Sequence, residues 1–272
     1  MDRFSGKVVV VTGGASGLGR ALCVELGRRG AKVFVADINE EGSKRTASII
    51  VDAGGAATPV VTDMRNREAV DSLIAQAASE GPLDYMFNNA GVIMFGEFRD
   101  MSPEDWRHFV ESDLMSVVYG TSAAYKVMMR QGHGHIVNVS SVFGLFPFAL
   151  ATGYTAVKQA VVGLSLALRP EAAGFGVKVS AACPGSIRTE VRKSYRIFNG
   201  DRESFNALIW KEMSPEKAVL KILGGVAKNK GIIAFPFYDL VPWWFYRFIP
   251  SMNGWWQRKL VNLFREKVRC KE

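Results

Sequence analysis

The chain has 272 residues, of which 48% are hydrophobic and 22% are charged, and this balance excludes an intrinsically disordered protein. Such a length suits one large α/β unit or two smaller domains. The formal net charge of +8 is concentrated after residue 187, where 17 of the 34 Lys and Arg residues stand against 8 of the 26 Asp and Glu residues. A nucleic-acid-binding protein would carry such charge on a recognition motif, and none is visible, so we expect no nucleic-acid partner.

The cysteines and the first residues indicate a reducing compartment. Cys23, Cys183 and Cys270 are odd in number and far apart, which argues against a disulfide framework and a metal cluster. The opening "MDRFSGKVVVVTGG" lacks the basic region and long apolar core of a secretory signal. No apolar run reaches the roughly 18 residues of a membrane span. We therefore expect a cytoplasmic protein that binds no metal.

Apolar, β-rich runs alternate with segments of helical period along most of the chain. This alternation is typical of a parallel sheet covered by helices. It predicts an α/β, Rossmann-type doubly wound parallel sheet of about seven strands in a single domain. The expected strands are 7–12, 32–36, 56–61, 83–87, 135–139, 177–182 and 231–235.

We expect this domain to occupy residues 1–239 and to include an irregular, partly helical insertion at about 186–214. Residues 240–272 are rich in aromatic and basic side chains and are expected to form a helical C-terminal extension.

The first strand runs into "TGGASGLGRAL", which places Gly13, Gly17 and Gly19 at a turn into a helix. Glycine allows a tight turn and lets backbone N–H groups approach a pyrophosphate at the helix N-terminus, although a plain strand-to-helix turn can also be glycine-rich. Asp37 ends the second strand, where a carboxylate can accept hydrogen bonds from an adenosine ribose and repel a 2′-phosphate. No Arg or Lys follows it at once, which favours NAD over NADP. The alternative is that Asp37 caps the next helix.

Tyr154 and Lys158 lie four residues apart, on one face of a predicted helix, with Ser141 upstream. A tyrosine normally loses its proton near pH 10, so it needs a neighbouring cation to act as an acid or base at neutral pH. Lys158 can supply that cation, which predicts a catalytic group. The alternative is an ordinary Tyr/Lys pair on a helix surface. Alternation along the preceding strand predicts that Ser140 points away from Ser141.

Five motifs in order and at matching spacing carry a family resemblance: TGxxxGxG at 12–19, "NNAG" at 88–91, Ser141, Tyr154-x-x-x-Lys158 and "PGSIRT" at 184–189. Over residues 5 to about 235 the chain resembles the short-chain dehydrogenase/reductase family, and its glycine spacing resembles the dehydrogenase branch. The resemblance implies an NAD-dependent oxidoreductase acting on an alcohol or ketone. It also implies a homodimer or homotetramer.

The resemblance also implies a role for each matching residue. Lys158 would bind the nicotinamide ribose, Ser141 would hold the substrate oxygen, and Tyr154 would exchange a proton with it. Asp63 would bind the adenine amino group, or else cap a helix. Asn88 and Gly91 would shape the floor of the cofactor site. The implied cofactor-binding residues are Gly13, Ser16, Gly17, Leu18, Gly19, Asp37, Asp63, Met64, Asn89, Ala90, Gly91, Tyr154, Lys158, Pro184, Gly185, Ile187 and Thr189.

One position departs from the family pattern. The family usually has Asn in the helix after the fourth strand, where it helps to hold a proton-relay water, and "WRHFVESDLMS" places Asp113 there. An amide donates and accepts hydrogen bonds, whereas an ionised carboxylate only accepts them. Because the other catalytic positions match, we include Asp113 among the catalytic residues as a working variant; the alternative is a weakened relay.

The segments expected near the substrate, 143–153 and 92–98, are rich in Phe, Leu and Met and poor in charge. Such a site suits a lipophilic or aromatic secondary alcohol or ketone, and it resembles that of hydroxysteroid and retinol-type members. His133 and His135 flank a glycine in a turn and are expected to be solvated. A dinucleotide sensor with weak catalysis and a membrane-surface scaffold are the rival classes.

Eleven of the chain's 30 aromatic residues lie between Phe235 and Phe264. Trp and Tyr beside Arg and Lys are typical of a membrane interface. Helical spacing places Trp256, Leu260, Val261 and Leu263 on one stripe, which predicts peripheral membrane contact. Alternatively, this tail covers the substrate entrance or packs on a partner subunit.

Overall fold

The computed structural model of the chain describes residues 2–189, 195–207 and 212–270. Its main sheet has seven parallel strands in the order β3-β2-β1-β4-β6-β7-β9. The predicted α/β fold class is confirmed, and each predicted strand range differs from the observed one by at most two residues at either end. The strands are β1 (Val8–Thr12), β2 (Lys32–Asp37), β3 (Ala56–Val61), β4 (Leu83–Asn88), β6 (Gly134–Val139), β7 (Val177–Pro184) and β9 (Ile232–Phe235).

Burial explains which residue types the strands contain. The central strand β1 has the sequence VVVVT and is buried along its whole length, because helices cover both faces of a parallel sheet. The strand β3 lies at one edge, is partly exposed, and contains Pro59, a residue that edge strands accommodate.

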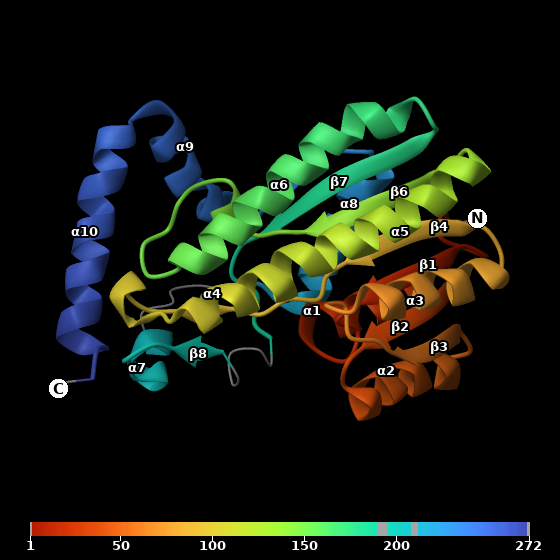
Figure 1. Cartoon of the computed structure of the whole chain (residues 1–272), viewed down its shortest axis with the longest axis horizontal. Coiled ribbons are helices and arrows are strands. Elements are labelled where there is room, and N and C mark those ends of the chain that lie inside the picture. Colours follow the sequence, from red (N-terminus) through yellow and green to blue (C-terminus); the bar gives the residue numbers. More distant parts are fainter. Residues whose placement is uncertain (1, 190–194, 208–211, 271–272) are drawn as a thin grey trace.

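Helices cover the two faces of the sheet (Figure 1). One hydrophobic core joins a face of the sheet to α1 (Gly17–Arg28), α2 (Glu40–Asp52) and α8 (Pro215–Ala227). A second core joins the opposite face to α3 (Arg67–Ser79), α5 (Ser116–Gln131) and α6 (Thr152–Ala173). The chain is therefore wound on both sides of the sheet, as predicted.

The strand order reverses between β1 and β4, which are neighbours in the sheet but belong to opposite halves of it. Loops leaving the carboxyl ends of such strands diverge to opposite faces and leave a crevice between them. The glycine-rich turn follows β1 and the NNAG segment follows β4, so both predicted motifs lie at this crevice.

A smaller sheet and several short helices lie beyond the carboxyl ends of the main strands. In this sheet β5 (Met94–Phe95) pairs with β8 (Arg196–Ile197). The insertion expected at about 186–214 contains β8 and α7 (Arg202–Ala207), while its residues 190–194 and 208–211 lie outside the described residues. The remaining short elements are η1 (Phe98–Asp100), α4 (Pro103–Phe109), the π-helical turn η2 (Val110–Met115) and η3 (Val142–Gly144).

After β9 the chain forms η5 (Phe237–Leu240), α9 (Val241–Phe248) and α10 (Pro250–Lys267), and the last two form a helical hairpin at one end of the molecule (Figure 1). Within the described residues, no helix has both the length and the apolar character needed to cross a bilayer.

Part of the predicted membrane-facing stripe of α10 lies against protein instead. Leu260 and Val261 pack on the cluster that contains the fully buried Phe264, and Trp256 contacts Phe148 edge to face at 5.9 Å. Helical spacing identified an apolar face but could not say that protein, not lipid, lies against it.

Candidate active site

A cavity of about 1200 Å³ opens at the carboxyl ends of the strands. The nineteen residues that were predicted to be catalytic or to bind the cofactor all line it. They come from the loops after β1, β3, β4, β6 and β7, from the ends of β2 and β7, from the start of α1, and from η2 and α6. These residues are Gly13, Ser16, Gly17, Leu18, Gly19, Asp37, Asp63, Met64, Asn89, Ala90, Gly91, Asp113, Ser141, Tyr154, Lys158, Pro184, Gly185, Ile187 and Thr189.

The glycine turn has the backbone geometry that close approach to a dinucleotide requires. Gly13 and Gly17 adopt φ values of +68° and +53°, which non-glycine residues rarely tolerate. A Cβ added to Gly19 would lie 1.9 Å from the Gly13 carbonyl oxygen, so any side chain at this position would clash with the backbone of the turn. The helix α1 begins here, and the side chain of its N-cap residue, Ser16, makes no capping hydrogen bond. The turn therefore fits a pyrophosphate at a helix N-terminus.

Asp37 supports this turn and does not cap the next helix. Its Oδ2 atom accepts a hydrogen bond from the Ala15 N–H at 2.9 Å, and its Oδ1 atom accepts one from the Asn39 N–H at 2.9 Å. Asn39 is the residue that caps α2, through its side chain. Asp37 thus holds its carboxylate at the cavity, between the glycine turn and the end of β2.

Asp63 also lies at this end of the cavity, and its helix-capping alternative is wrong because Asn66 caps α3. The Arg65 side chain lies 2.7 Å from Asp63 and, by hydrogen bonding, lowers the pKa of that carboxyl group. Arg65 lines the cavity too. The sequence does not single out Arg65 as a cofactor contact, because it follows β3 and does not directly follow Asp37.

Tyr154 lies in the first turns of α6, with the Lys158 Nζ atom 5.4 Å from the centre of its ring. Ser141 ends the loop after β6 and caps η3, where its hydroxyl accepts a hydrogen bond from the Phe143 N–H at 3.3 Å. The Ser140 hydroxyl instead donates to the Lys158 carbonyl at 2.7 Å, which agrees with the predicted alternation. The fold therefore brings Ser141, Tyr154 and Lys158 together.

Burial raises the pKa of Tyr154, whereas Lys158 and a hydrogen bond with Ser141 lower it and Asp113 raises it; the net direction is upward. Lys158 thus lowers the pKa of Tyr154, as predicted, but the opposite effect of burial is larger. A positive nicotinamide ring beside the phenol would add a second cation that favours the phenolate.

Asp113 makes an ion pair with Lys158 at the back of the site. The Asp113 Oδ1 and Lys158 Nζ atoms are 2.9 Å apart, and both side chains are at least 95% buried. Burial lowers the pKa of Lys158, but Asp113 and Tyr154 raise it, and the net direction is upward. The other carboxylate oxygen, Oδ2, accepts a hydrogen bond from the Val92 N–H at 3.0 Å.

Two local features accommodate this ion pair. Asp113 belongs to the π-helical turn η2, a type of irregularity that often marks functional sites. Gly91 passes so close that an added Cβ would lie 2.5 Å from Asp113 Oδ1. A glycine is therefore required at this position of the loop after β4, where the chain passes Asp113.

The end of the cavity beside Tyr154 is largely apolar. The rings of Phe143 and Phe148 stack with their centres 4.2 Å apart, and Tyr154 lies edge-on to Phe143 at 6.3 Å. Further aromatic and aliphatic side chains complete the lining: Ile93, Phe95, Phe146, Tyr195, Phe205, Pro242 and Trp256.

The C-terminal segment contributes to this cavity, which agrees with the alternative that the tail covers the substrate entrance. Tyr238, Asp239, Pro242 and Trp256 line the cavity. The Asp239 Oδ2 atom accepts a hydrogen bond from the Ser186 N–H at 3.0 Å, and burial raises the pKa of this carboxyl group. Asp239 itself is not among the predicted site residues, because nothing in its sequence neighbourhood indicates the contact with Ser186.

Two other predictions are wrong. Asn88 does not line the cavity; its side chain is 1% exposed and donates to Asn138 and Thr121 behind the floor. His135 is not solvated, since it belongs to β6, makes a 2.8 Å hydrogen bond with Ser180 and has a pKa lowered to about 3 by burial. Both side chains belong to strands whose polar residues pair within the protein.

Comparisons with known proteins agree with this geometry. Residues 7–199 match the short chain dehydrogenase family. Putative oxidoreductase SadH of Mycobacterium tuberculosis is 35% identical over 240 residues, covering 85% of this chain and 86% of that protein. Cyclopentanol dehydrogenase of Comamonas testosteroni is 37% identical over 193 residues, covering 70% and 76%.

A solved structure shows the same architecture. A short chain dehydrogenase/reductase from Burkholderia phymatum, in complex with NAD, superposes with a TM-score of 0.84 at 26% identity and covers 93% of this chain and 96% of its own. The matched sequence, the shared sheet and the arrangement of Ser141, Tyr154 and Lys158 lead to one conclusion: this chain belongs to the short-chain dehydrogenase/reductase family of oxidoreductases.

Proposed function

We propose that this protein transfers a hydride between NAD(H) and a lipophilic or aromatic secondary alcohol or ketone, with Tyr154 as the general acid/base. One observation carries the proposal: a single cavity joins the glycine turn and Asp37 at one end to Tyr154, Ser141 and aromatic walls at the other. A dinucleotide bound along the turn would point its reactive ring towards Tyr154.

The cofactor assignment rests on Asp37 and on the related structure. The Asp37 carboxylate lies at the adenosine end, where it would accept hydrogen bonds from ribose hydroxyls and repel a 2′-phosphate. The related Burkholderia phymatum protein was solved with NAD. Both observations favour NAD over NADP.

When bound, NAD accepts or supplies the hydride. The chain's own groups handle the proton and the position of the substrate. The Ser141 hydroxyl holds the substrate oxygen, and the Tyr154 hydroxyl gives a proton to a ketone or takes one from an alcohol. Lys158 stabilises the ionised phenol, while Asp113 fixes the lysine in place and offsets part of its charge.

The substrate class follows from the walls. Phe143, Phe148 and Trp256 exclude water and offer no charge to a polar substrate, which suits apolar rings. Two relatives carry names that fit: cyclopentanol dehydrogenase, and 2,5-dichloro-2,5-cyclohexadiene-1,4-diol dehydrogenase LinX of Sphingobium indicum, 37% identical over 191 residues. Both names describe the dehydrogenation of cyclic alcohols.

A panel of cycloalkanols, aromatic secondary alcohols and the matching ketones, each assayed with NAD and NADP by the absorbance of the reduced nicotinamide, tests the proposal. We expect turnover with NAD and a kcat/KM that rises with the apolar area of the substrate. NAD binding without turnover of any substrate would instead support a dinucleotide sensor. A preference for polar, charged substrates would contradict the apolar assignment.

A further inference from the structure

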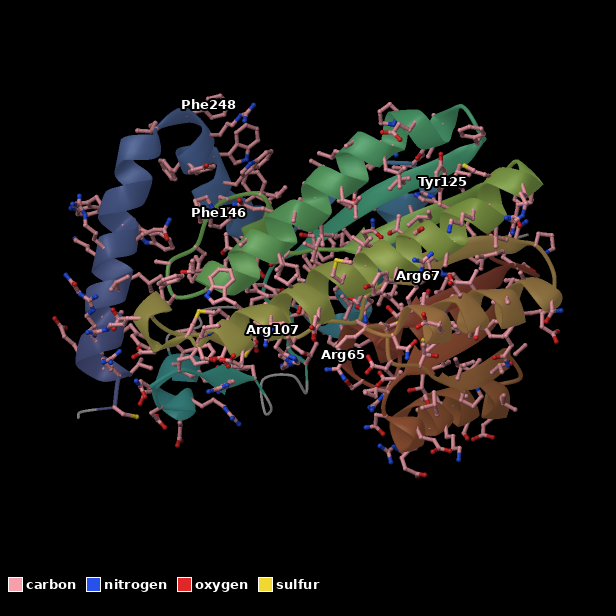
Figure 2. All side chains as sticks on the ribbon, viewed as in Figure 1. Arg65, Arg67, Arg107, Tyr125, Phe146 and Phe248 are labelled. Atoms are coloured by element: carbon pink, nitrogen blue, oxygen red, sulfur yellow. The ribbon has the colours of Figure 1, made fainter. Side chains whose placement is uncertain are left out.

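The hairpin of α9 and the start of α10 presents apolar side chains that the rest of the described chain leaves exposed. The helix α9 has no buried residue, and the Phe237 and Phe248 side chains are 76% and 69% exposed. Figure 2 shows Phe248 at the turn between the two helices, at the edge of the molecule. We call the following residues the hairpin surface: Phe237, Val241, Trp244, Phe245, Tyr246, Phe248, Ile249 and Trp255.

This surface is concentrated in one place. Ten of the nineteen large hydrophobic residues that are exposed in the described chain lie between Phe237 and Trp256. Several of its rings pack on one another and not on the core: Trp244 stacks on Phe248 with ring centres 5.6 Å apart, and it contacts Trp243 at 5.1 Å. Contiguous exposed apolar surface of this kind marks a site of association.

The charge around the hairpin surface indicates the chemistry of its partner. Residues 240–265 contain Arg247, Arg258, Lys259 and Arg265 and no Asp or Glu. Arg265 is paired with Glu97, which leaves three exposed cations beside the rings. The Lys259 Nζ atom lies 3.9 Å from the centre of the Trp255 ring. A partner of complementary chemistry is therefore anionic and able to accept aromatic side chains.

We propose that the hairpin surface binds the surface of anionic lipid bilayers. Trp and Tyr rings are favoured at the headgroup level, and nearby cations are attracted to anionic lipid. A two-fold contact with a second copy of this chain would bring the same basic, acid-free segment against itself, which like charges oppose. The hairpin lies on the membrane in this assignment and does not span it.

The rest of the protein holds the hairpin in a fixed position. The Gln257 side chain donates to the Pro147 carbonyl at 2.9 Å and accepts from the Ala149 N–H. Further along the chain, Arg265 of α10 and Arg269, which follows that helix, bind Glu97. The hairpin surface therefore has a defined orientation relative to the active site.

The same hairpin forms part of the active-site wall, because Pro242 and Trp256 line the cavity. If the proposed function is correct, a lipophilic substrate dissolved in the bilayer would enter beside these residues. This consequence rests on the proposed function, whereas the binding of lipid does not.

Co-sedimentation of the full-length protein with vesicles tests the binding. One vesicle type contains phosphatidylcholine alone, and the other contains phosphatidylcholine with a substantial fraction of phosphatidylglycerol. We expect sedimentation with the anionic vesicles at low salt and a marked loss at high salt, because salt screens the attraction. Absence of binding to anionic vesicles at low salt, or equal binding to both vesicle types, would overturn the proposal.

Three variants separate the contribution of the exposed rings to vesicle binding from that of the cations. The double variant W244S/F248S should lower the bound-to-free ratio by about tenfold or more, because both rings lose their place at the interface. The charge variant R247Q/R258Q/K259Q should lose the preference for anionic vesicles. The matched control F175S/L220S alters two residues that are 52% and 51% exposed elsewhere and should bind as the wild type does. Unchanged binding of W244S/F248S would overturn the proposal.

Two further measurements distinguish the remaining outcomes. Light scattering after gel filtration would reveal a subunit contact: a lower oligomeric state in W244S/F248S together with no vesicle binding by the wild type would overturn the lipid assignment. Turnover of a water-soluble secondary alcohol should be equal in wild type and W244S/F248S. Lack of turnover by the wild type would contradict the proposed function and leave the sedimentation result standing.

Discussion

Tyr154 combines a partly buried phenol with two neighbours that favour its ionised form and one that opposes it. Lys158 and Ser141 lower its pKa, whereas Asp113 raises it. The hydroxyl is the group that exchanges a proton with the substrate in the proposed mechanism, so its removal should affect chemistry and not the binding of cofactor.

We predict that Tyr154→Phe lowers kcat by at least about a hundredfold, the low end for general acid–base catalysis, and leaves NAD affinity within a few-fold of wild type. Stopped-flow or steady-state kinetics measure the first effect, and titration of protein fluorescence with NADH measures the second. Near-native turnover would show that another group carries the proton.

Asp113 differs from the usual amide in one respect that matters electrostatically, because its negative charge lies 2.9 Å from Lys158. The ion pair stabilises the ammonium form of the lysine while it weakens the effect of that lysine on the phenol. Removal of the charge should therefore lower the pKa of Tyr154.

Asp113→Asn should fold and keep or raise activity at neutral pH. Alcohol oxidation requires the ionised phenol, so activity rises as the pH passes upward through the pKa, and the variant's profile should shift to lower pH. The pH dependence of kcat/KM measures the shift. Glu111→Gln is the matched control, because it makes the same change on an exposed residue of the same turn. Complete loss of activity in Asp113→Asn alone would give the carboxylate a role of its own.

At the scale of elements, a group of ion pairs, here called the tether, joins the C-terminal segment to η1 and the residue before it. These ion pairs hold α10 beside the cavity. Glu97 is buried and binds Arg265 of α10 and Arg269, which follows that helix. Arg269 also binds Asp100. Hydrogen bonding by Arg265 is the largest influence on the Glu97 carboxyl group and holds its pKa below the usual range.

We predict that Glu97→Gln lowers the free energy of unfolding at neutral pH by on the order of 1–3 kcal/mol, because charge-assisted bonds to a buried carboxylate are lost. A carboxyl group whose pKa is lower in the folded than in the unfolded protein stabilises the folded state. Its contribution is complete above the pKa of the unfolded state and is lost as the pH falls through the pKa of the folded state. The difference in free energy of unfolding between Glu97→Gln and the wild type should thus decrease below pH ~4, near the pKa of a glutamate in the unfolded chain. Urea denaturation at several pH values measures it. Glu104→Gln, in an exposed pair, should change little; an equal effect there would contradict the tether.

The main strands could be predicted because each is a short apolar run between turn residues. Periodicity and composition alone indicate their ranges. The five motifs contain fifteen of the nineteen predicted residues that line the cavity, and the other four, Asp37, Asp63, Met64 and Asp113, were predicted from their places after strands or in a helix. The two-residue strands β5 and β8 carry no such signal, since they form only where distant segments meet. His135 was misjudged because its neighbours resemble a turn, although its strand is buried.

The C-terminal segment could be predicted as helical but not placed. The sequence of α10 shows an apolar stripe, and only the folded chain reveals that Leu260 and Val261 pack on protein while α9 remains exposed. Asp239 was missed for the same reason, because its contact with Ser186 joins parts of the chain more than fifty residues apart.

At the scale of the whole molecule, the cavity links the two halves of the sheet. Residues from the loops after β1, β2 and β3 line one end of the cavity, and residues that follow β4, β6 and β7, together with the C-terminal segment, line the rest. Thr189 illustrates the link, since an added Cβ on Gly17 would lie 3.2 Å from its side chain. A ligand that fills this cavity contacts both halves at once and should stabilise them together.

We therefore predict that NAD raises the thermal midpoint of unfolding of the whole chain. A ligand present at a hundred times its Kd stabilises the folded state by about 2.7 kcal/mol, which corresponds to roughly 5 °C or more for a chain of this size. Tyr154→Phe should keep this shift, because it removes only the proton-transfer group. In Asp37→Ala the shift with NAD should shrink relative to the shift with NADP, since the carboxylate that repels a 2′-phosphate is absent. Differential scanning fluorimetry with each cofactor measures these shifts. A larger shift with NADP than with NAD in the wild type would show that Arg65, which also lines the adenosine end, outweighs Asp37 in cofactor choice.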